Sequence, residues 1–245
     1  MRPLIFIISV FVLLLAPLAT TAAQTDSLES YDENETDFRM SVGLSGGLIL
    51  VNPSQLNDQI AFANNSFDAN MDNVRSMMLF AGYIRIKPRL SPFLLMRIEA
   101  LTVSRSFDYT ADGRSSGNTP TGTFNYSGLT RWSIYPIVIG IGTTIPKTPI
   151  EAEVGAMYAL GYITDESRVA GGSPLTTTSS GDGWGFQGRI APHYRFSKNA
   201  SIAFEISYRF LVMKNYSDNL GRNAENFQLD LNGISVCFGL LYTLQ

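Results

Sequence analysis

The sequence predicts an all-β fold, an eight-stranded antiparallel up-and-down transmembrane β-barrel with short periplasmic turns and long extracellular loops. Three observations lead to this prediction. Eight apolar runs alternate with a period of two, their connectors alternate between short and long, and charged side chains share one face of the runs with glycines and small residues. The formal net charge is −3, so no basic surface suggests a nucleic-acid partner.

The N-terminus has the features of an export signal. Arg2 supplies the positive start, residues 4–15 form an apolar core, and small residues precede Gln24. The apolar stretch is shorter than the roughly 20 residues that a membrane-spanning helix needs. We therefore predict that residues 1–23 are a cleaved signal peptide and that the chain is exported.

An acidic segment follows the predicted cleavage site. Residues 24–37 contain six carboxylates and no basic side chain. A segment of this composition cannot bury enough apolar surface to fold by itself. We therefore predict a disordered acidic N-terminal segment at residues 24–38, followed by a single barrel domain at residues 39–245.

The apolar runs are predicted to be strands that cross a membrane. Residues 200–213 show the pattern, because Ile202, Phe204 and Ile206 lie on one face and Ala203 and Glu205 on the other. Runs of about 12–16 residues exceed the 5–6 that are common in soluble strands, and they suit a tilted membrane strand. The predicted strands occupy residues 39–51, 74–87, 93–107, 129–145, 150–164, 184–196, 200–213 and 229–244.

The connectors of this pattern differ in length at the two ends. Short connectors span residues 88–92, 145–149 and 196–200, whereas long polar ones span 52–73, 108–128, 165–183 and 214–228. We expect the long connectors to be polar loops. Residues 53–65 leave a helical turn open, but their periodicity is too weak to predict a helix. Aromatic residues near the ends of the runs, such as Tyr83, Phe93 and Trp132, are expected in girdles at the membrane interface.

The cost of burying charge in lipid decides which face of each strand points outward. An arginine in the middle of a bilayer costs about 2–4 kcal/mol, whereas arginines and glutamates inside a narrow barrel can pair. We therefore predict a lumen charge network of Arg97, Glu99, Glu151, Glu153, Arg189, His193, Arg195, Glu205 and Arg209. The predicted lipid-facing residues include Ile137, Ile139, Tyr158, Phe186, Phe204, Phe238 and Tyr242.

The signal peptide, the eight alternating runs and the asymmetry of the connectors together resemble the small outer-membrane barrels of Gram-negative-type bacteria, of the OmpA, OmpX and OmpW kinds. The resemblance covers residues 39–245 and implies a place in the bacterial outer membrane. It also implies contact with outer-membrane lipids and lipopolysaccharide, and insertion by the outer-membrane assembly machinery. Such barrels usually end in an aromatic residue that this machinery reads, whereas here Leu244 and Gln245 follow Tyr242.

Catalytic, cofactor-binding and metal sites are not predicted. One cysteine and one histidine are too few for a metal cluster. Outer-membrane lipid A deacylases, which have a similar barrel, carry a serine two positions after a histidine, but here that position is Arg195. Ser197 would lie about 13 Å from His193 along an extended strand, at about 3.3 Å per residue, and a hydrogen-bonded nucleophile and base need about 3 Å.

The expected role is therefore non-enzymatic. We predict a monomeric barrel without a cofactor, whose lumen is filled by side chains and whose long polar loops have a structural role or bind an extracellular partner. One alternative is a narrow channel or transporter for small or hydrophobic solutes. A second alternative is a soluble secreted lipocalin-like barrel, which would place Tyr158, Phe204 and Phe238 inside.

Overall fold

The computed structural model describes residues 38–88, 92–114, 120–170, 172–218 and 227–244. The predicted signal peptide and the acidic residues 24–37 lie outside this part of the chain.

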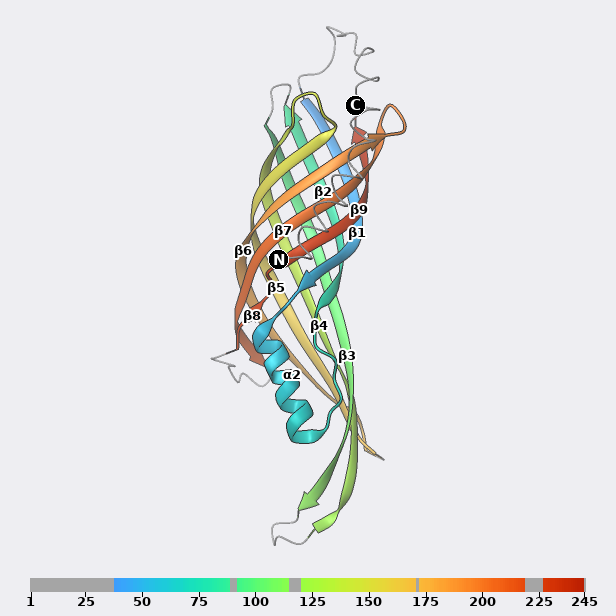
Figure 1. The fold of residues 1–245 in the computed structure, drawn as a ribbon, viewed down its shortest axis with the longest axis vertical. Coiled ribbons are helices and arrows are strands. Elements are labelled where there is room, and N and C mark those ends of the chain that lie inside the picture. Colours follow the sequence, from blue (N-terminus) through green and yellow to red (C-terminus); the bar gives the residue numbers. More distant parts are fainter. Residues whose placement is uncertain (1–37, 89–91, 115–119, 171, 219–226, 245) are drawn as a thin grey trace, which may run out of the picture.

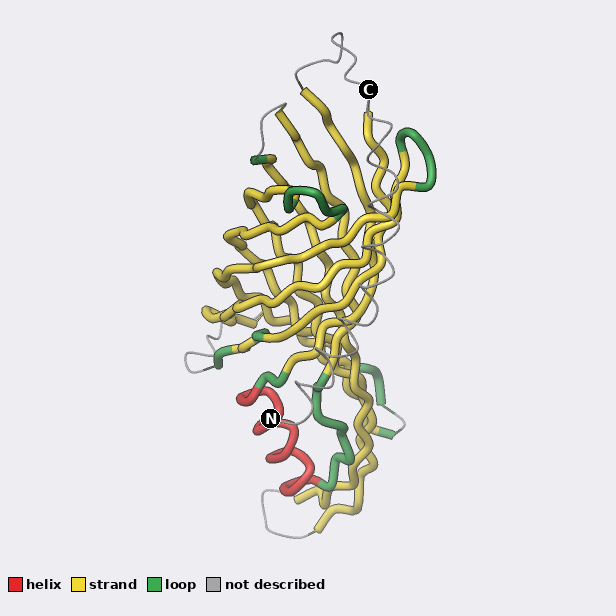
Figure 2. The backbone as a smooth tube through the Cα atoms, turned by 45° about the horizontal axis from the view of Figure 1, so that its top comes forward, coloured by secondary structure: helices red, strands yellow, loops and turns green. Residues whose placement is uncertain are grey.

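One antiparallel sheet closes on itself to form a barrel (Figures 1 and 2). Each long strand pairs with the next one along the chain, and β9 closes the ring by pairing with both β7 and β1. The predicted eight-stranded antiparallel barrel is thus confirmed. Its strands are β1 (Phe38–Val51), β2 (Ser76–Pro88), β3 (Phe93–Arg114), β4 (Pro120–Thr144), β5 (Ile150–Val169), β6 (Leu175–Arg195), β7 (Ala200–Asp218) and β9 (Gly233–Leu244), with the two-residue β8 (Leu229–Asp230) beside β7.

Two of the connectors predicted as loops are largely strand. Strands β3 and β4 stay paired from the barrel out to Arg114 and Pro120, and β5 and β6 stay paired as far as Ser167 and Leu175. These residues are polar and give little hydrophobic signal, but a ladder that begins in the barrel continues through them. Cross-strand side chains support it, since the rings of Tyr109 and Tyr126 stack at 4.9 Å.

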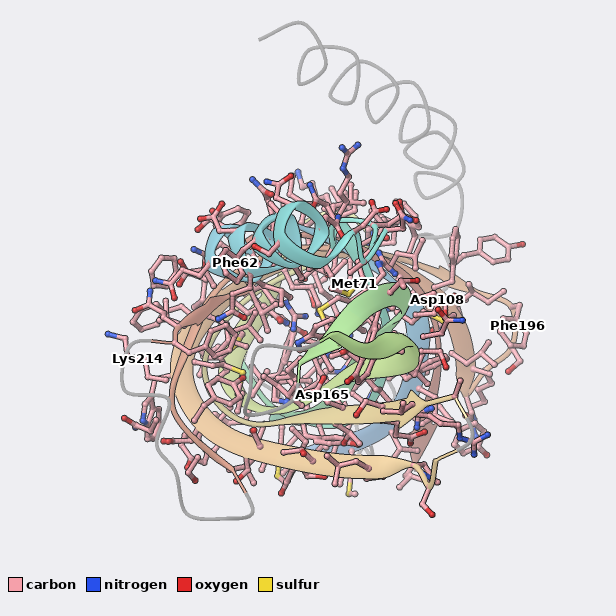
Figure 3. The ribbon with its side chains drawn as sticks, turned by 90° about the horizontal axis from the view of Figure 1, so that it is seen from below. Phe62, Met71, Asp108, Asp165, Phe196 and Lys214 are labelled. Atoms are coloured by element: carbon pink, nitrogen blue, oxygen red, sulfur yellow. The ribbon has the colours of Figure 1, made fainter. Side chains whose placement is uncertain are left out.

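The first long connector contains a helix that the sequence did not predict. Helix α2 (Ser54–Phe67) lies across one side of the mouth at the long-loop end (Figures 1 and 3). Its buried residues Leu56 and Ile60, one turn apart, pack on the apolar interior. Most of its other residues are polar, which explains the weak periodicity. No helix in the described part of the chain is long and apolar enough to cross a membrane.

Two asparagines on α2 join the helix to the segment that returns to β2. The Asn57 side chain accepts a hydrogen bond from the Val74 N–H at 2.7 Å and donates one to the Val74 carbonyl at 3.1 Å. Asn64 makes the same two bonds with Met71, both at 2.8 Å. Each side-chain amide therefore binds the backbone N–H and carbonyl of one residue in the returning segment, as a neighbouring strand would.

Replacing both Asn57 and Asn64 with alanine should loosen residues 54–74 without opening the barrel. The backbone groups of Met71 and Val74 would lose their partners, which costs about 1–3 kcal/mol of local stability per site. Hydrogen exchange in this segment should then become about tenfold faster or more. Mass spectrometry would measure it, with the exposed Asn65→Ala variant as control. Unchanged exchange in the double variant would contradict this role of the two amides.

The barrel interior has two zones. The half near the short turns contains charged residues, described below, and the half under α2 is apolar. The apolar zone includes Ile49, Leu79, Leu101, Trp132, Ile134, Met157, Leu211 and Met213, all buried.

Three of the aromatic residues predicted for interfacial girdles point inward instead. Tyr83, Phe93 and Trp132 are at most 4% exposed. Glycines make room for two of them, because a methyl group at Gly43 would overlap the ring of Tyr83 and one at Gly142 would overlap that of Phe93. The girdle prediction is therefore wrong for these residues, since it used their position along the strand without knowing the face.

Candidate functional site: the filled lumen

A chain of alternating charges crosses the lumen. Its members come from β3, β5, β6 and β7, and all are buried. In order of contact they are Arg209, Glu99, Arg97, Glu205, Arg189 and Glu153.

The central link of this chain is Glu205. One carboxylate oxygen lies 2.7 Å from Arg97 Nη1 and the other lies 2.7 Å from Arg189 Nη1. The guanidinium groups of both arginines also lie over the ring of Tyr83, each 5.4 Å from the centroid. Two cations therefore lie over one aromatic ring, and the same carboxylate contacts both.

The two ends of the chain are also paired. Glu99 binds Arg97 Nε at 2.8 Å and Arg209 Nη1 at 2.7 Å. At the other end, Arg189 holds Glu153 through two bonds, Nε at 2.6 Å and Nη2 at 2.5 Å. Such bidentate pairs fix geometry as well as charge. Pairing matters here because an uncompensated charge in the interior is strongly destabilising.

A second cluster lies closer to the short turns. Glu151 binds Arg85, and its Oε2 lies 2.8 Å from His193 Nε2. Arg85 was not among the predicted lumen charges, because the alternation in residues 74–87 is too weak to assign its face. In the structure Met77, Leu79, Ala81, Tyr83 and Arg85 are buried at alternate positions, so they form the inner face of this strand.

The structure brings most of the predicted lumen charges together, with one exception. Arg195 is exposed at the last position of β6, so the prediction that places it in the charge network is corrected. It lies on the predicted strand face, but the strand ends there and the side chain meets solvent at the rim. The predicted residues that lie in the interior ion pairs are Arg97, Glu99, Glu151, Glu153, Arg189, His193, Glu205 and Arg209.

The opposite face of the strands is apolar and points outward. Ile139, Phe186 and Phe238 are 66%, 68% and 65% exposed, and Ile137 and Tyr242 are exposed as well. Tyr158 and Phe204 are half-buried on this outer face, where their rings contact Trp184 and Phe238. The lipocalin-like alternative required Tyr158, Phe204 and Phe238 inside the barrel, and their positions rule it out.

The distribution of charged and apolar side chains shows whether water or lipid surrounds the barrel. Arg97, Arg189 and Arg209 are at most 3% exposed, while large apolar side chains cover the outside. A barrel in water would have the opposite arrangement, with charged side chains outside and apolar ones inside. In lipid the apolar face can point outward, and a closed sheet has no unpaired edge there. This chain is a transmembrane β-barrel.

Comparisons with known proteins give the following likenesses to the barrel. No protein-family model matches the sequence, and no curated protein matches it. A major outer membrane protein from Thermus thermophilus is 12% identical, with a TM-score of 0.42, and the match covers 85% of this chain and 100% of that one. OprG from Pseudomonas aeruginosa is 12% identical, with a TM-score of 0.40, covering 84% and 96%. Neisserial surface protein A is 12% identical, with a TM-score of 0.34, covering 84% and 97%.

The charged side chains inside the barrel are paired with one another. The ion pairs described above join four arginines and four glutamates. Within the described ranges, no three His, Cys, Asp or Glu side chains are placed to hold a metal ion. The Ser197 hydroxyl accepts a hydrogen bond from the Ala200 N–H at 3.0 Å, so it belongs to the turn after β6.

Proposed function

We propose that this protein is an outer-membrane barrel with a closed lumen, which has a structural or surface-interaction role through its long-loop end. The proposal rests on the side chains that fill the lumen. Paired arginines and glutamates occupy the half near the short turns, and the apolar cluster under α2 occupies the other half. A barrel of eight strands has an interior just wide enough for side chains to fill.

The apolar zone is the stronger argument against a conducting path. Ions that passed the charged zone would next meet side chains such as Leu79, Leu101 and Leu211, which are at most 1% exposed. Leu56 and Ile60 of α2 belong to the same cluster, so the helix covers this zone at the long-loop end. An ion would have to lose its water there without gaining polar partners, which is strongly unfavourable.

The proposed interaction surface is the sheet that extends beyond the barrel. Strands β3 to β6 continue past the apolar outer face, and Figure 1 shows the β3–β4 hairpin as the far end of the molecule. Strand β2 pairs with β3 only as far as Thr102, so residues 103–114 form an edge of this extension. The guanidinium of Arg105 binds the carbonyls of Asp72 and Asn73 at the base of the edge. An edge of this kind is a template for an added strand of a partner.

Planar-bilayer recording of the purified barrel tests the closed lumen. We expect no sustained conductance steps from the wild-type protein. Its folding would be verified first by the different gel mobility of boiled and unboiled samples. Sustained steps that change in Arg189→Gln or Glu153→Gln would overturn the proposal and support the narrow-channel alternative, because both residues lie in the charge chain. The proposal assigns no catalytic role to His193.

A further inference from the structure

Three exposed cations lie in or beside neighbouring turns at the end of the barrel that carries the short turns. Lys147 belongs to the turn between β4 and β5, Arg195 ends β6, and Lys198 belongs to the turn between β6 and β7. The His193 N–H donates a hydrogen bond to the Pro149 carbonyl at 2.8 Å, so the first turn lies beside the last residues of β6. We call Lys147, Arg195 and Lys198 the short-turn cations.

In the part of the chain that the structure describes, none of the short-turn cations forms an ion pair. The turns at residues 145–149 and 196–200 contain no aspartate or glutamate. Glu151 follows the first turn, but it is buried and already contacts Arg85 and His193. Because all three short-turn cations are exposed, a negatively charged ligand can reach them from outside the barrel.

Each of the two turns places its lysine just beyond the apolar outer face. Ile145 is exposed where β4 ends, and Lys147 follows it by two residues. Tyr194 and Phe196 are exposed at the end of β6, and Lys198 follows Phe196 by two residues. Figure 3, which views the barrel along its length, shows Phe196 at the periphery. Both hairpins therefore end in an exposed apolar side chain followed by a lysine.

This spacing places the two lysines at the level of lipid phosphates. Two extended residues span about 7 Å, at about 3.3 Å per residue. A bilayer has a hydrocarbon core of about 30 Å and a total thickness of about 40–45 Å, which leaves a headgroup layer of about 5–8 Å on each side. Because Ile145 and Phe196 end the apolar face, Lys147 and Lys198 fall within this layer. Exposed aromatic side chains such as Tyr194 are typical of the same interface.

The backbone of the first turn would suit glycine better than lysine. Lys147 has a φ of 64°, in the left-handed region that side chains other than glycine rarely adopt. The Thr148 N–H and hydroxyl both donate to the Ile145 carbonyl, at 3.1 and 3.0 Å, and they hold the turn in this form. Backbone strain of this kind is concentrated at functional positions. The side chain rather than the backbone therefore explains a lysine here.

We propose that the short-turn cations bind the phosphate group of an anionic phospholipid in the leaflet at this end of the barrel. The acyl chains of this lipid lie against the apolar outer face beside Phe196. Arginine binds phosphate through paired hydrogen bonds, and lysine acts as a point charge. Each basic side chain near an anionic membrane surface raises affinity about fivefold. The site does not depend on a closed lumen, so it adds to the function proposed above.

Amide NMR shifts in lipid nanodiscs test the site on the folded, signal-free chain. The discs contain phosphatidylcholine with increasing fractions of phosphatidylglycerol. We expect the amide signals of Thr148 and Ser197, each next to a lysine of the site, to shift and saturate, while that of Arg168 on the polar extension stays in place. Absence of these shifts would overturn the proposal. It would also be overturned if inorganic phosphate reproduced them in pure phosphatidylcholine discs, because the site would then take a free anion.

Neutral variants measure what the cations contribute to this binding. The combined Lys147→Gln, Arg195→Gln and Lys198→Gln variant should bind phosphatidylglycerol about tenfold more weakly or worse. A matched control, Arg168→Gln, removes an exposed cation of the polar extension and should bind as the wild type does. Different gel mobility of boiled and unboiled samples verifies that each variant is folded. Equal affinity of the triple variant and the wild type would overturn the proposal.

The single Lys147→Gly variant separates lipid binding from a structural role of this residue. Glycine accepts the φ of 64° without strain, so the urea midpoint of unfolding in phosphatidylcholine vesicles should not fall. The affinity for phosphatidylglycerol should nevertheless drop about fivefold, because one cation is lost. A lower midpoint together with unchanged lipid affinity would overturn the proposal, since Lys147 would then serve the turn and not the lipid.

Discussion

Replacing Glu205 with alanine should destabilise the barrel by about 3–5 kcal/mol, the range observed when one partner of a buried ion pair is removed. Arg97 and Arg189 would lose the carboxylate that lies 2.7 Å from each of them. They would remain over the Tyr83 ring as two buried cations without this carboxylate. Urea unfolding of the barrel in lipid vesicles or detergent, followed by tryptophan fluorescence and gel mobility, would measure the loss.

A second glutamate provides the control for this experiment. Glu166 lies on the extension of β5 and is exposed, so Glu166→Ala should change stability by less than about 0.5 kcal/mol. The Glu205→Gln variant keeps the shape but removes the charge, and it should fall between wild type and Glu205→Ala. A loss below about 1 kcal/mol in Glu205→Ala, the size of a surface pair, would mean that the charge chain does not hold the lumen together.

Replacing Ile139 with arginine should cost about 2–4 kcal/mol in a bilayer, because this side chain would enter the lipid core. Ile139 is 66% exposed and lies in the middle of the outward series of β4 that runs from Tyr135 to Ile141. The measurement is again urea unfolding in vesicles. A water-soluble barrel would tolerate the same substitution, since exposed positions usually change by less than about 0.5 kcal/mol.

The matched control places arginine on the same outer surface but beyond the apolar layer. Ser104 on β3 is exposed and pairs with Arg131 of β4, so an arginine is already accommodated at this level. Ser104→Arg should therefore cost about 0–1 kcal/mol, as expected near the membrane interface. Similar losses in both variants would contradict the assignment of the lipid-facing belt.

Alternation in the sequence was sufficient to predict the two faces wherever polar and apolar residues separate cleanly. In β7, Glu205 and Arg209 fall opposite Phe204 and Phe210, and the structure places them accordingly. The strand that contains Tyr83 and Arg85 has apolar residues on both faces, because its inner face also lines the apolar zone. Its register became clear only through pairing with β1 and β3.

The long connectors also contain secondary structure that the local sequence pattern does not predict. Helix α2 has two buried apolar residues, Leu56 and Ile60, and asparagines that bind the returning segment. Neither feature creates a strong periodic pattern. The polar extensions of β3 to β6 likewise form strands because neighbouring strands are already aligned by the barrel.

The sequence by itself determined the number of strands, the closed barrel and the face of each clean strand, because period-two alternation and connector length are local properties. It also determined which charges must avoid lipid. Only the tertiary structure decided which partners those charges take, such as Glu205 between Arg97 and Arg189, and that Arg195 lies outside the lumen. These contacts join residues far apart in the chain, and they depend on the stagger of strands around the ring, which no single strand encodes.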